Sequence, residues 1–381
     1  MALPIFVTTH HRPWKVNGGI EQHIQVFLRG LTARGLSARV LSPFEQPAWL
    51  RLGALAPNKL LRGAAQADWY ERSRAFLLER SLRAALSPDA PALIYAQDPI
   101  SSAEAVKLKL AGYPLRVVQA IHYNVSVAEE WLGKGMLKRG DRVFERLQRR
   151  DRWLLPQLDR LVFVSEFMRR EVLRQVPEAA SVPSFVIPNC VFPAEPVAAD
   201  AADLVSIGTL EPRKNQAFLL DVLAEADKLG QAYSLDLIGG GVAGALKAKA
   251  AALGLGSRVR LLGSVPDAAA KLGNYRAYVH AAKMESFGIV LIEAMAAGLP
   301  VFAAPVGGVP EVFSDGDGGR HWDLNNPAGA ARKLVAVLED PARYRALSQA
   351  AAARFQANFS ASAVTPRLLD AVLGGAAGLE G

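Results

Sequence analysis

Short apolar runs alternate with longer amphipathic stretches along the whole chain. In the first half, "LPIFVTT" precedes the helical pattern "GGIEQHIQVFLRGLTARG", and the apolar runs "ALIYAQ" and "LRVVQAIH" follow. The second half repeats this rhythm, with "ADLVSIGTL", "YSLDLIGGG" and "AYVHAA" as its apolar runs. Continuous apolar strands that alternate with helices are typical of parallel sheets covered on both faces. The pattern therefore predicts an α/β protein with two Rossmann-like, doubly wound parallel-sheet domains.

The two series meet in a segment rich in proline and alanine, "VPSFVIPNCVFPAEPVAADAAD", which we interpret as a linker. A chain of 381 residues also exceeds the usual size of a single core. We expect an N-terminal Rossmann-like domain over residues 1–190 and a C-terminal Rossmann-like domain over residues 191–362. Residues 363–381 should form a final helix and tail that can cross back to the N-terminal domain. Two such domains facing across a cleft would place ligands where the carboxyl ends of their strands meet.

The composition narrows the class of protein. The one cysteine, Cys190, excludes an intramolecular disulfide, argues against a structural zinc site and fits a reducing compartment. The start of the chain lacks the pattern of a signal peptide, and no run of about 18 apolar residues occurs that could span a bilayer. We therefore expect a cytoplasmic protein, at most peripheral on the inner face of the membrane.

The formal charge of +8 favours anionic partners. Much of it lies in Lys134–Trp153, where eight basic residues outnumber three acidic ones. Val143, Phe144 and Leu147 fall at helical spacing there, so the segment predicts an amphipathic helix with a basic face. Such a face either is simply solvated or binds an acidic membrane surface. Aromatic residues are not interleaved with the charges, so we expect no nucleic-acid partner.

The stretch "SIGTLEPRKN" predicts a strand that ends at Gly208, a short loop, and Lys214 at the entrance to a helix. A glycine there lets the backbone approach a ligand, and a lysine over a helix N-terminus suits a phosphate group. Arg213 doubles the positive charge. The alternative is an ordinary polar loop.

The stretch "MESFGIVLIEAMAAGLP" carries two glutamates. It predicts a loop with Glu285, Ser286 as the N-cap, and a helix that ends near Ala297 with Glu293 about two turns along it. The amides at such a helix start form a ready anion site. One ligand would satisfy these groups: a sugar hydroxyl at Glu285, a diphosphate on the amides and Lys214, and ribose hydroxyls at Glu293. The alternative is a capped helix with an incidental glutamate.

Several motifs in order resemble those of one family. "ESFGIVLIE" followed by "GLPVFAAPVGGVPE" resembles the E-x7-E signature of retaining GT-B glycosyltransferases, in particular glycosyltransferase family 4. "NGGIEQHI" is similar to the family's N-terminal glycine loop, and "GTLEPRKN" to the motif with its diphosphate-binding lysine. "VSEFMRREV" and "VIPNCV" are similar to its segments before and within the interdomain crossing. The resemblance extends along most of the chain.

The resemblance implies that residues 1–190 form the acceptor-binding domain and residues 191–362 the nucleotide-sugar donor domain. It also implies a role for individual residues of the C-terminal half. Glu285 matches the glutamate beside the donor sugar, Glu293 the glutamate that holds the nucleotide ribose, and Lys214 the lysine that neutralises the diphosphate. The residues that match the helix start, which meets the sugar and phosphate through its backbone, are Gly288, Ile289 and Val290.

It also implies roles in the N-terminal half. Gly18 and Gly19 match the loop that admits the diphosphate, and His122 matches an active-site histidine close to the donor sugar and the acceptor. Without the family, a single histidine after a strand is more often structural. The chain also departs from the pattern, because Thr209 stands where the family often has arginine. We hypothesise that Arg213 supplies the missing charge, and we keep both residues among the donor-binding set.

The family resemblance implies a retaining hexosyltransferase that moves a sugar from a nucleoside-diphosphate sugar to a glycan or lipid-linked acceptor, as in surface polysaccharide synthesis. A double displacement would need a carboxylate nucleophile. The resemblance implies front-face transfer instead, with electrostatic stabilisation of the leaving diphosphate and no metal or other cofactor. "DGDGG", Asp315–Gly319, is then a turn rather than a metal site. The alternatives are a nucleotide-sugar epimerase or hydrolase of the same fold, and a non-catalytic nucleotide-binding protein.

Overall fold

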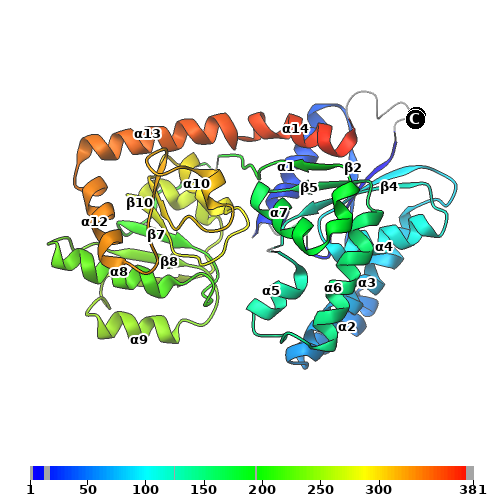
Figure 1. The fold of residues 1–381 in the computed structure, drawn as a ribbon, viewed down its shortest axis with the longest axis horizontal. Coiled ribbons are helices and arrows are strands. Elements are labelled where there is room, and N and C mark those ends of the chain that lie inside the picture. The colour runs from blue at the N-terminus through cyan, green and yellow to red at the C-terminus, as the bar shows by residue number, and fades with distance from the viewer. Residues whose placement is uncertain (1–2, 13–17, 124, 194, 375–381) are drawn as a thin grey trace. The chain divides into compact units, whose positions relative to one another are not determined.

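The computed structural model describes residues 3–12, 18–123, 125–193 and 195–374. They form an α/β fold with two six-stranded sheets in which every pairing of strands is parallel (Figure 1). The chain divides into two compact units, Met1–Pro188 with Val364–Gly381 and Asn189–Ala363. The predicted fold class, two doubly wound parallel sheets, is confirmed.

The sheet of the first unit has the strand order β2-β1-β3-β4-β5-β6. Its strands are β1 (Ile5–Thr8), β2 (Ala38–Leu41), β3 (Ala92–Ala96), β4 (Leu115–Ile121), β5 (Arg160–Phe163) and β6 (Ser184–Val186). Its helices are α1 (Gly19–Ala33), α2 (Ala48–Leu55), α3 (Gly63–Ala85), α4 (Pro99–Leu110), α5 (Val127–Gly133), α6 (Arg142–Leu154) and α7 (Glu166–Gln175). The chain leaves β1 for β2 on one side and then returns to β3 on the other. The winding direction therefore reverses between β1 and β3, which is where ligands bind in such sheets.

The sheet of the second unit has the order β12-β11-β10-β7-β8-β9. Its strands are β7 (Leu204–Ile207), β8 (Leu235–Ile238), β9 (Val259–Gly263), β10 (Ala277–His280), β11 (Val301–Ala303) and β12 (Gly319–His321). Its helices are α8 (Gln216–Lys228), α9 (Gly244–Ala252), α10 (Ile289–Ala296), α11 (Val309–Val312), α12 (Pro327–Leu338) and α13 (Pro341–Asn358). Here the winding reverses between β7 and β10.

Burial explains why the apolar runs form central strands. All five residues of β3 are buried, and in β4 every residue except Arg116 is buried. In the second unit, Phe218, Phe302 and Trp322 pack in one core cluster with the strand residues beneath them. Strands that are apolar on both faces need helices on both sides, so the sequence pattern and the layered fold agree.

The segment interpreted as a linker is partly structured, which corrects that interpretation. Residues 184–186 form β6, which pairs with β5 in the first unit through Val162 and Phe185. The final helix, α14 (Ala361–Leu373), begins two residues before the predicted start at 363 and contains Pro366. From Val364 onward it belongs to the first unit, where Arg160 Nη1 donates to the carbonyl of Ala371 at 2.8 Å.

The basic segment Lys134–Trp153 is helical only in part, because α6 begins at Arg142. Phe144, Leu147 and Leu154 are its buried apolar residues. Figure 1 shows α6 beside α3 and α4. Within the described ranges, no helix has both the length and the apolar character that a membrane crossing requires.

Candidate active site

Two loops meet at the point where the winding of the second sheet reverses. The first follows β7, passes Gly208 and reaches α8 through Asn215, which adopts a left-handed conformation with φ 51°. The second follows β10 and leads to α10. Because β7 and β10 are paired neighbours, both loops leave the same edge of the sheet side by side.

The loops are joined by an ion pair between Lys214 and Glu285. Lys214 Nζ donates to Glu285 Oε2 at 2.5 Å, and their side chains are only 14% and 11% exposed. Burial alone would raise the pKa of Glu285, but the Lys214 ammonium and His280 outweigh it and hold that pKa well below its usual range. The site thus holds a fixed carboxylate and a fixed ammonium next to each other.

His280 is a third member of this cluster that the sequence analysis did not identify. Its Nε2 lies 3.3 Å from the same oxygen, Glu285 Oε2, and its ring is stacked on Tyr278. Burial lowers the pKa of His280, so the ring is neutral near pH 7. His280 is the last residue of β10, at the reversal point, and that position could have identified it as a candidate site residue.

Backbone contacts fix both loops. The Lys283 amide donates to the carbonyl of Arg213 at 2.9 Å, and Arg213 Nη1 donates to the carbonyl of Met284 at 3.1 Å. The Gly308 amide donates to the carbonyl of Glu285 at 2.9 Å. Arg213 also pairs with Glu211 at 2.7 Å. Arg213 therefore braces the two loops, and its charge is partly balanced within its own loop.

The start of α10 differs from the prediction. The N-cap residue is Gly288 rather than Ser286, and Gly288 has a left-handed conformation with φ 93°. A Cβ at Gly288 would lie 2.8 Å from Leu291 Cδ1, so a glycine is required for the tight turn. Ile289 and Val290 form the first turn of α10, whose amides have no partner within the helix. Glu293 is half-buried, one turn further on.

Thr209 is exposed, and its carbonyl accepts a hydrogen bond from Gln216 Nε2 at 3.0 Å. The β7 loop packs against the glycine run that follows β8, Gly239–Gly241. Together with Gly244, this run has the G-x-G-x-x-G spacing of dinucleotide-binding loops. A Cβ at Gly239 would lie 2.0 Å from the carbonyl oxygen of Gly208, so close backbone packing against the β7 loop explains that glycine.

The reversal point of the first sheet holds a histidine–aspartate pair that the sequence analysis also missed. His10 Nδ1 lies 3.0 Å from Asp98 Oδ1, and the His10 amide donates to Asp98 Oδ2 at 2.8 Å. Burial would raise the pKa of Asp98, but His10 and the Ser101 amide lower it well below its usual range. Gly18 and Gly19, which the resemblance assigns to the glycine loop, lie at the start of α1. Asn17, the first residue of that motif, lies outside the described residues.

His122 follows β4 in the same unit. Its Nε2 lies 3.1 Å from Gln97 Oε1, and its ring meets the His23 ring edge-on at 4.7 Å. Burial, with a further contribution from His23, lowers the pKa of His122 well below its usual value. The structure thus brings His122 close to Gln97, which adjoins Asp98 at the reversal point.

No group of three or more histidine, cysteine, aspartate or glutamate side chains able to hold a metal ion occurs in the part of the chain that the structure describes. Asp315 accepts hydrogen bonds from the His321 amide at 2.6 Å and from Arg320 at 3.1 Å. Asp317 pairs with Arg354 at 2.7 Å. Asp315 is therefore used within its own turn, and Asp317 ties that turn to α13.

Comparison with known proteins agrees with this architecture. The chain has a TM-score of 0.70 against Anabaena HepE in complex with UDP and glucose, at 18% identity, with 97% of this chain and 98% of that chain covered. Phosphatidyl-myo-inositol mannosyltransferase of Mycobacterium tuberculosis is 36% identical over 180 residues, which cover 45% of this chain and 47% of that protein. D-inositol 3-phosphate glycosyltransferase of Thermobispora bispora is 32% identical over 226 residues, covering 56% and 50%. The chain spans about half the length of the curated relatives it matches.

The two sheets define the GT-B class of glycosyltransferase folds. Residues 17–195 match the family model described as Glycosyltransferase Family 4, and residues 192–354 match the model of Glycosyl transferases group 1. The chain accordingly belongs to glycosyltransferase family 4, as the sequence motifs indicated.

Proposed function

We propose that this protein is a retaining hexosyltransferase that moves a sugar from a nucleoside-diphosphate sugar to a hydroxyl of a glycan or lipid-linked acceptor. The observation that carries the proposal is the Lys214–Glu285 pair beside the start of α10. A nucleotide sugar has a diphosphate next to sugar hydroxyls, so it matches an ammonium and helix-start amides next to a carboxylate. UDP is bound by HepE, a protein of the same fold, which supports a nucleoside diphosphate as the ligand.

In this proposal each group of the second unit has a separate role in binding the donor or stabilising the leaving group. Lys214 and the amides of Gly288 and Ile289 stabilise the charge that develops on the departing diphosphate. Glu285 accepts a hydrogen bond from a sugar hydroxyl, and its low pKa keeps it ionised throughout the working pH range. Glu293 receives the ribose hydroxyls. The leaving diphosphate takes up the proton of the incoming hydroxyl, so the reaction needs no metal and no carboxylate nucleophile.

His122 in the first unit is proposed to act beside the donor sugar and the acceptor hydroxyl. Since burial keeps its ring neutral near pH 7, it can donate or accept a single hydrogen bond there without adding charge. The acceptor is proposed to be lipid-linked or glycan in nature, because the mycobacterial relative is named for a phosphatidyl-inositol acceptor. A role in surface polysaccharide synthesis and peripheral binding to an acidic membrane through residues 134–153 belong to the same proposal.

The first experiment is a binding isotherm of the purified protein with UDP, GDP and ADP, each without added metal. We expect tight binding of one of them, and that nucleotide then names the donors to assay for turnover. Glu285→Gln should bind the nucleotide within about threefold of wild type, since its partner in the ligand is the sugar, yet lose about 10²-fold in turnover. Failure of a folded sample to bind any of the three would overturn the proposal.

The epimerase or hydrolase alternative is separated from transfer by the acceptor. With the donor fixed, added acceptor should raise the rate of nucleotide release for a transferase and leave it unchanged for an epimerase or hydrolase. A non-catalytic binding protein would show nucleotide binding with no release of nucleotide from the sugar in either case.

A further inference from the structure

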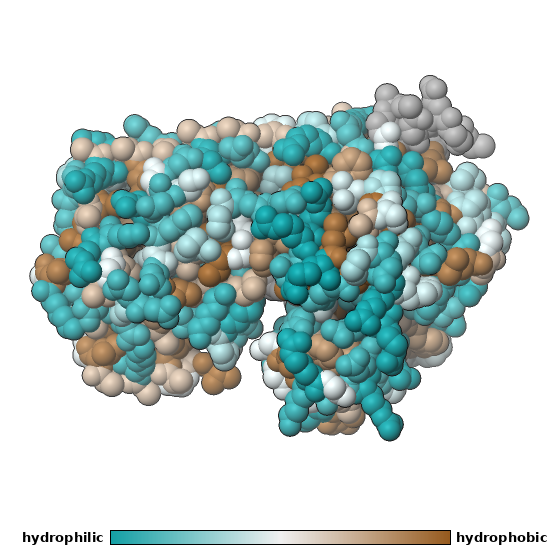
Figure 2. Space-filling view, viewed as in Figure 1, coloured by the Kyte–Doolittle hydropathy of each residue, from teal (hydrophilic) through white to brown (hydrophobic). Residues whose placement is uncertain are grey.

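A pocket lies among three helices of the first unit, α3, α4 and α6. Its volume is about 410 Å³, and four of its lining residues come from the basic segment of α6: Arg146, Arg149, Arg150 and Trp153. The basic segment is therefore more than a solvated helix face, because part of it forms a wall. Figure 2 shows hydrophilic side chains gathered over α6 on the visible face of this unit.

The lining is cationic with an apolar component. Five cationic side chains line it, Arg72, Lys107, Arg146, Arg149 and Arg150, against two carboxylates, Glu71 and Glu104. Ile100, Ala103 and Trp153 supply apolar surface on the same walls. A ligand with an anionic group on a small, partly apolar body would match both components.

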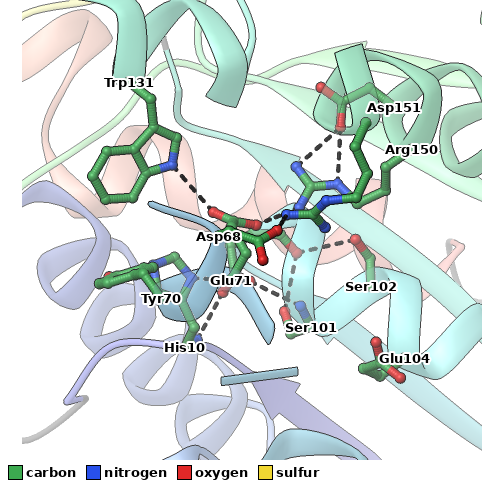
Figure 3. Close-up of polar contacts among 12 residues, drawn as sticks. His10, Asp68, Tyr70, Glu71, Ser101, Ser102, Glu104, Trp131, Arg150 and Asp151 are labelled. Atoms are coloured by element: carbon green, nitrogen blue, oxygen red, sulfur yellow. Dashed lines mark hydrogen bonds and ion pairs between the residues drawn. The ribbon is translucent and has the colours of Figure 1, made fainter. Parts of the chain in front are cut away.

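Both carboxylates are already neutralised within the protein. Glu71 pairs with Arg150 at 2.6 Å and also accepts from Trp131 Nε1 at 3.3 Å, as Figure 3 shows. Glu104 pairs with Lys107 at 2.7 Å. Each carboxylate side chain is only 5% exposed, so neither presents free negative charge to the pocket.

The remaining cations are less completely paired. Arg146 and Arg72 share one carboxylate, Asp68, at 2.7 and 2.8 Å, and Arg146 Nε is buried without a hydrogen-bond partner. Arg149 has no ion pair or hydrogen bond among the described residues, and its side chain is exposed at the pocket. The pocket therefore keeps donor capacity and positive charge that the protein itself does not use.

We propose that this pocket binds a phosphate group carried on a small ester, with Arg149 as the principal cation and Trp153 against the body of the ligand. A tetrahedral phosphate accepts from several guanidinium donors at once, as Arg146 and Arg149 of α6 and Arg72 of α3 offer from two helices. The phosphate comes either from a soluble ester or from a phospholipid headgroup. This site is built by helices of the first unit alone and does not depend on the donor site of the second.

The test compares two arginines of α6. Arg149 lines the pocket, whereas Arg152 is exposed on the same helix and does not line it. Arg149→Gln and Arg152→Gln therefore remove the same charge from the same element. Binding is measured by calorimetry with glycerol 3-phosphate, and by cosedimentation with vesicles of phosphatidylcholine and phosphatidylglycerol. Thermal melts establish that both variants fold.

We expect Arg149→Gln to weaken binding about tenfold, the loss of one charge-assisted hydrogen bond, and Arg152→Gln to weaken it by no more than about twofold. If Arg149→Gln weakens the binding of glycerol 3-phosphate more than Arg152→Gln does, a soluble ester is a ligand. If Arg149→Gln weakens only the binding of vesicles in this way, the ligand is a phospholipid headgroup. Equal effects of the two variants would show that only the general charge of α6 matters and would overturn the proposal. Absence of binding to both probes by wild type would also overturn it. Neither assay contains nucleotide, so the outcome is independent of the proposed transferase activity.

Discussion

Lys214 Nζ lies 2.5 Å from Glu285 Oε2, although the two residues are 71 positions apart in the chain. The contact follows from the strand order, because β7 and β10 pair through Leu204 with Ala277 and Val205 with Tyr278. Parallel neighbours send their following loops off the same edge, and the reversal of winding leaves space between those loops for a ligand. The fold therefore creates the ion pair, and the pair fixes both loops.

The buried pair predicts an asymmetric effect on stability. Replacing Lys214 with methionine leaves the Glu285 carboxylate buried without its ammonium partner, and we expect a loss of about 3–5 kcal/mol in the free energy of unfolding. The double variant Lys214→Met with Glu285→Gln removes that charge, so it should be more stable than Lys214→Met alone. Urea denaturation of the wild type, both single variants and the double variant gives the interaction free energy between the two side chains. Additive effects would show that the two side chains do not interact in solution.

The low pKa of Glu285 predicts how stability depends on pH. The pKa in the folded protein lies below the ordinary value of 4.5, so the folded state binds this proton less readily than the unfolded state. The stability that Glu285 contributes is therefore fully present above about pH 4.5 and decreases as the pH falls through the folded-state pKa. Between about pH 6 and pH 3, wild type should lose more free energy of unfolding than Glu285→Gln, because the amide does not titrate. Parallel curves for the two proteins would contradict the assignment of a low pKa to this residue.

The sequence was sufficient for the fold class and for the loops that build the site in the second unit. The apolar runs that became β3 and β4 are buried along almost their whole length, so their pattern carried a strong signal. Local rules failed at the start of α10. Ser286 has the right chemistry for an N-cap, but Gly288 holds that position because the chain must make a left-handed turn there. The need for that turn comes from tertiary packing, which residue preferences do not contain.

Pairs distant in sequence could not be predicted for the same reason. His10 and Asp98 are separated by 88 positions, and each reads locally as an ordinary polar residue after a strand. Only the order β2-β1-β3 brings the ends of β1 and β3 together. Likewise, the sequence alone shows that the segment of α6 is basic. Only the positions of α3 and α4 in the fold show that part of this segment lines a pocket.

Two glycines with left-handed conformations make a matched test of the loop that holds Glu285. A Cβ at Gly307, φ 58°, would lie 2.0 Å from the carbonyl oxygen of Glu285, whereas a Cβ at Gly316, φ 92°, would meet nothing within 4 Å. Alanine at either position carries the cost of a left-handed conformation, about 1–2 kcal/mol. Only Gly307→Ala should also displace Glu285, so we expect it to lose nucleotide binding or turnover by more than about tenfold. Gly316→Ala should lower the melting temperature with kinetic constants close to wild type. Similar kinetics for both variants would show that the position of this loop is unimportant.

His122 is the residue of the first unit whose proposed role is most readily separated from folding. Its Nε2 contacts Gln97 Oε1 at 3.1 Å, and glutamine at position 122 retains a hydrogen-bonding side chain. Because the nucleotide is proposed to bind in the second unit, His122→Gln should leave nucleotide affinity within about twofold of wild type. It should lower transfer turnover about tenfold to hundredfold, as expected for one lost hydrogen bond near the reacting sugar. His321→Gln, a histidine of β12 outside both clusters, is the control and should affect neither quantity. A His122→Gln protein with wild-type turnover would assign His122 a structural role and leave the donor site of the second unit as proposed.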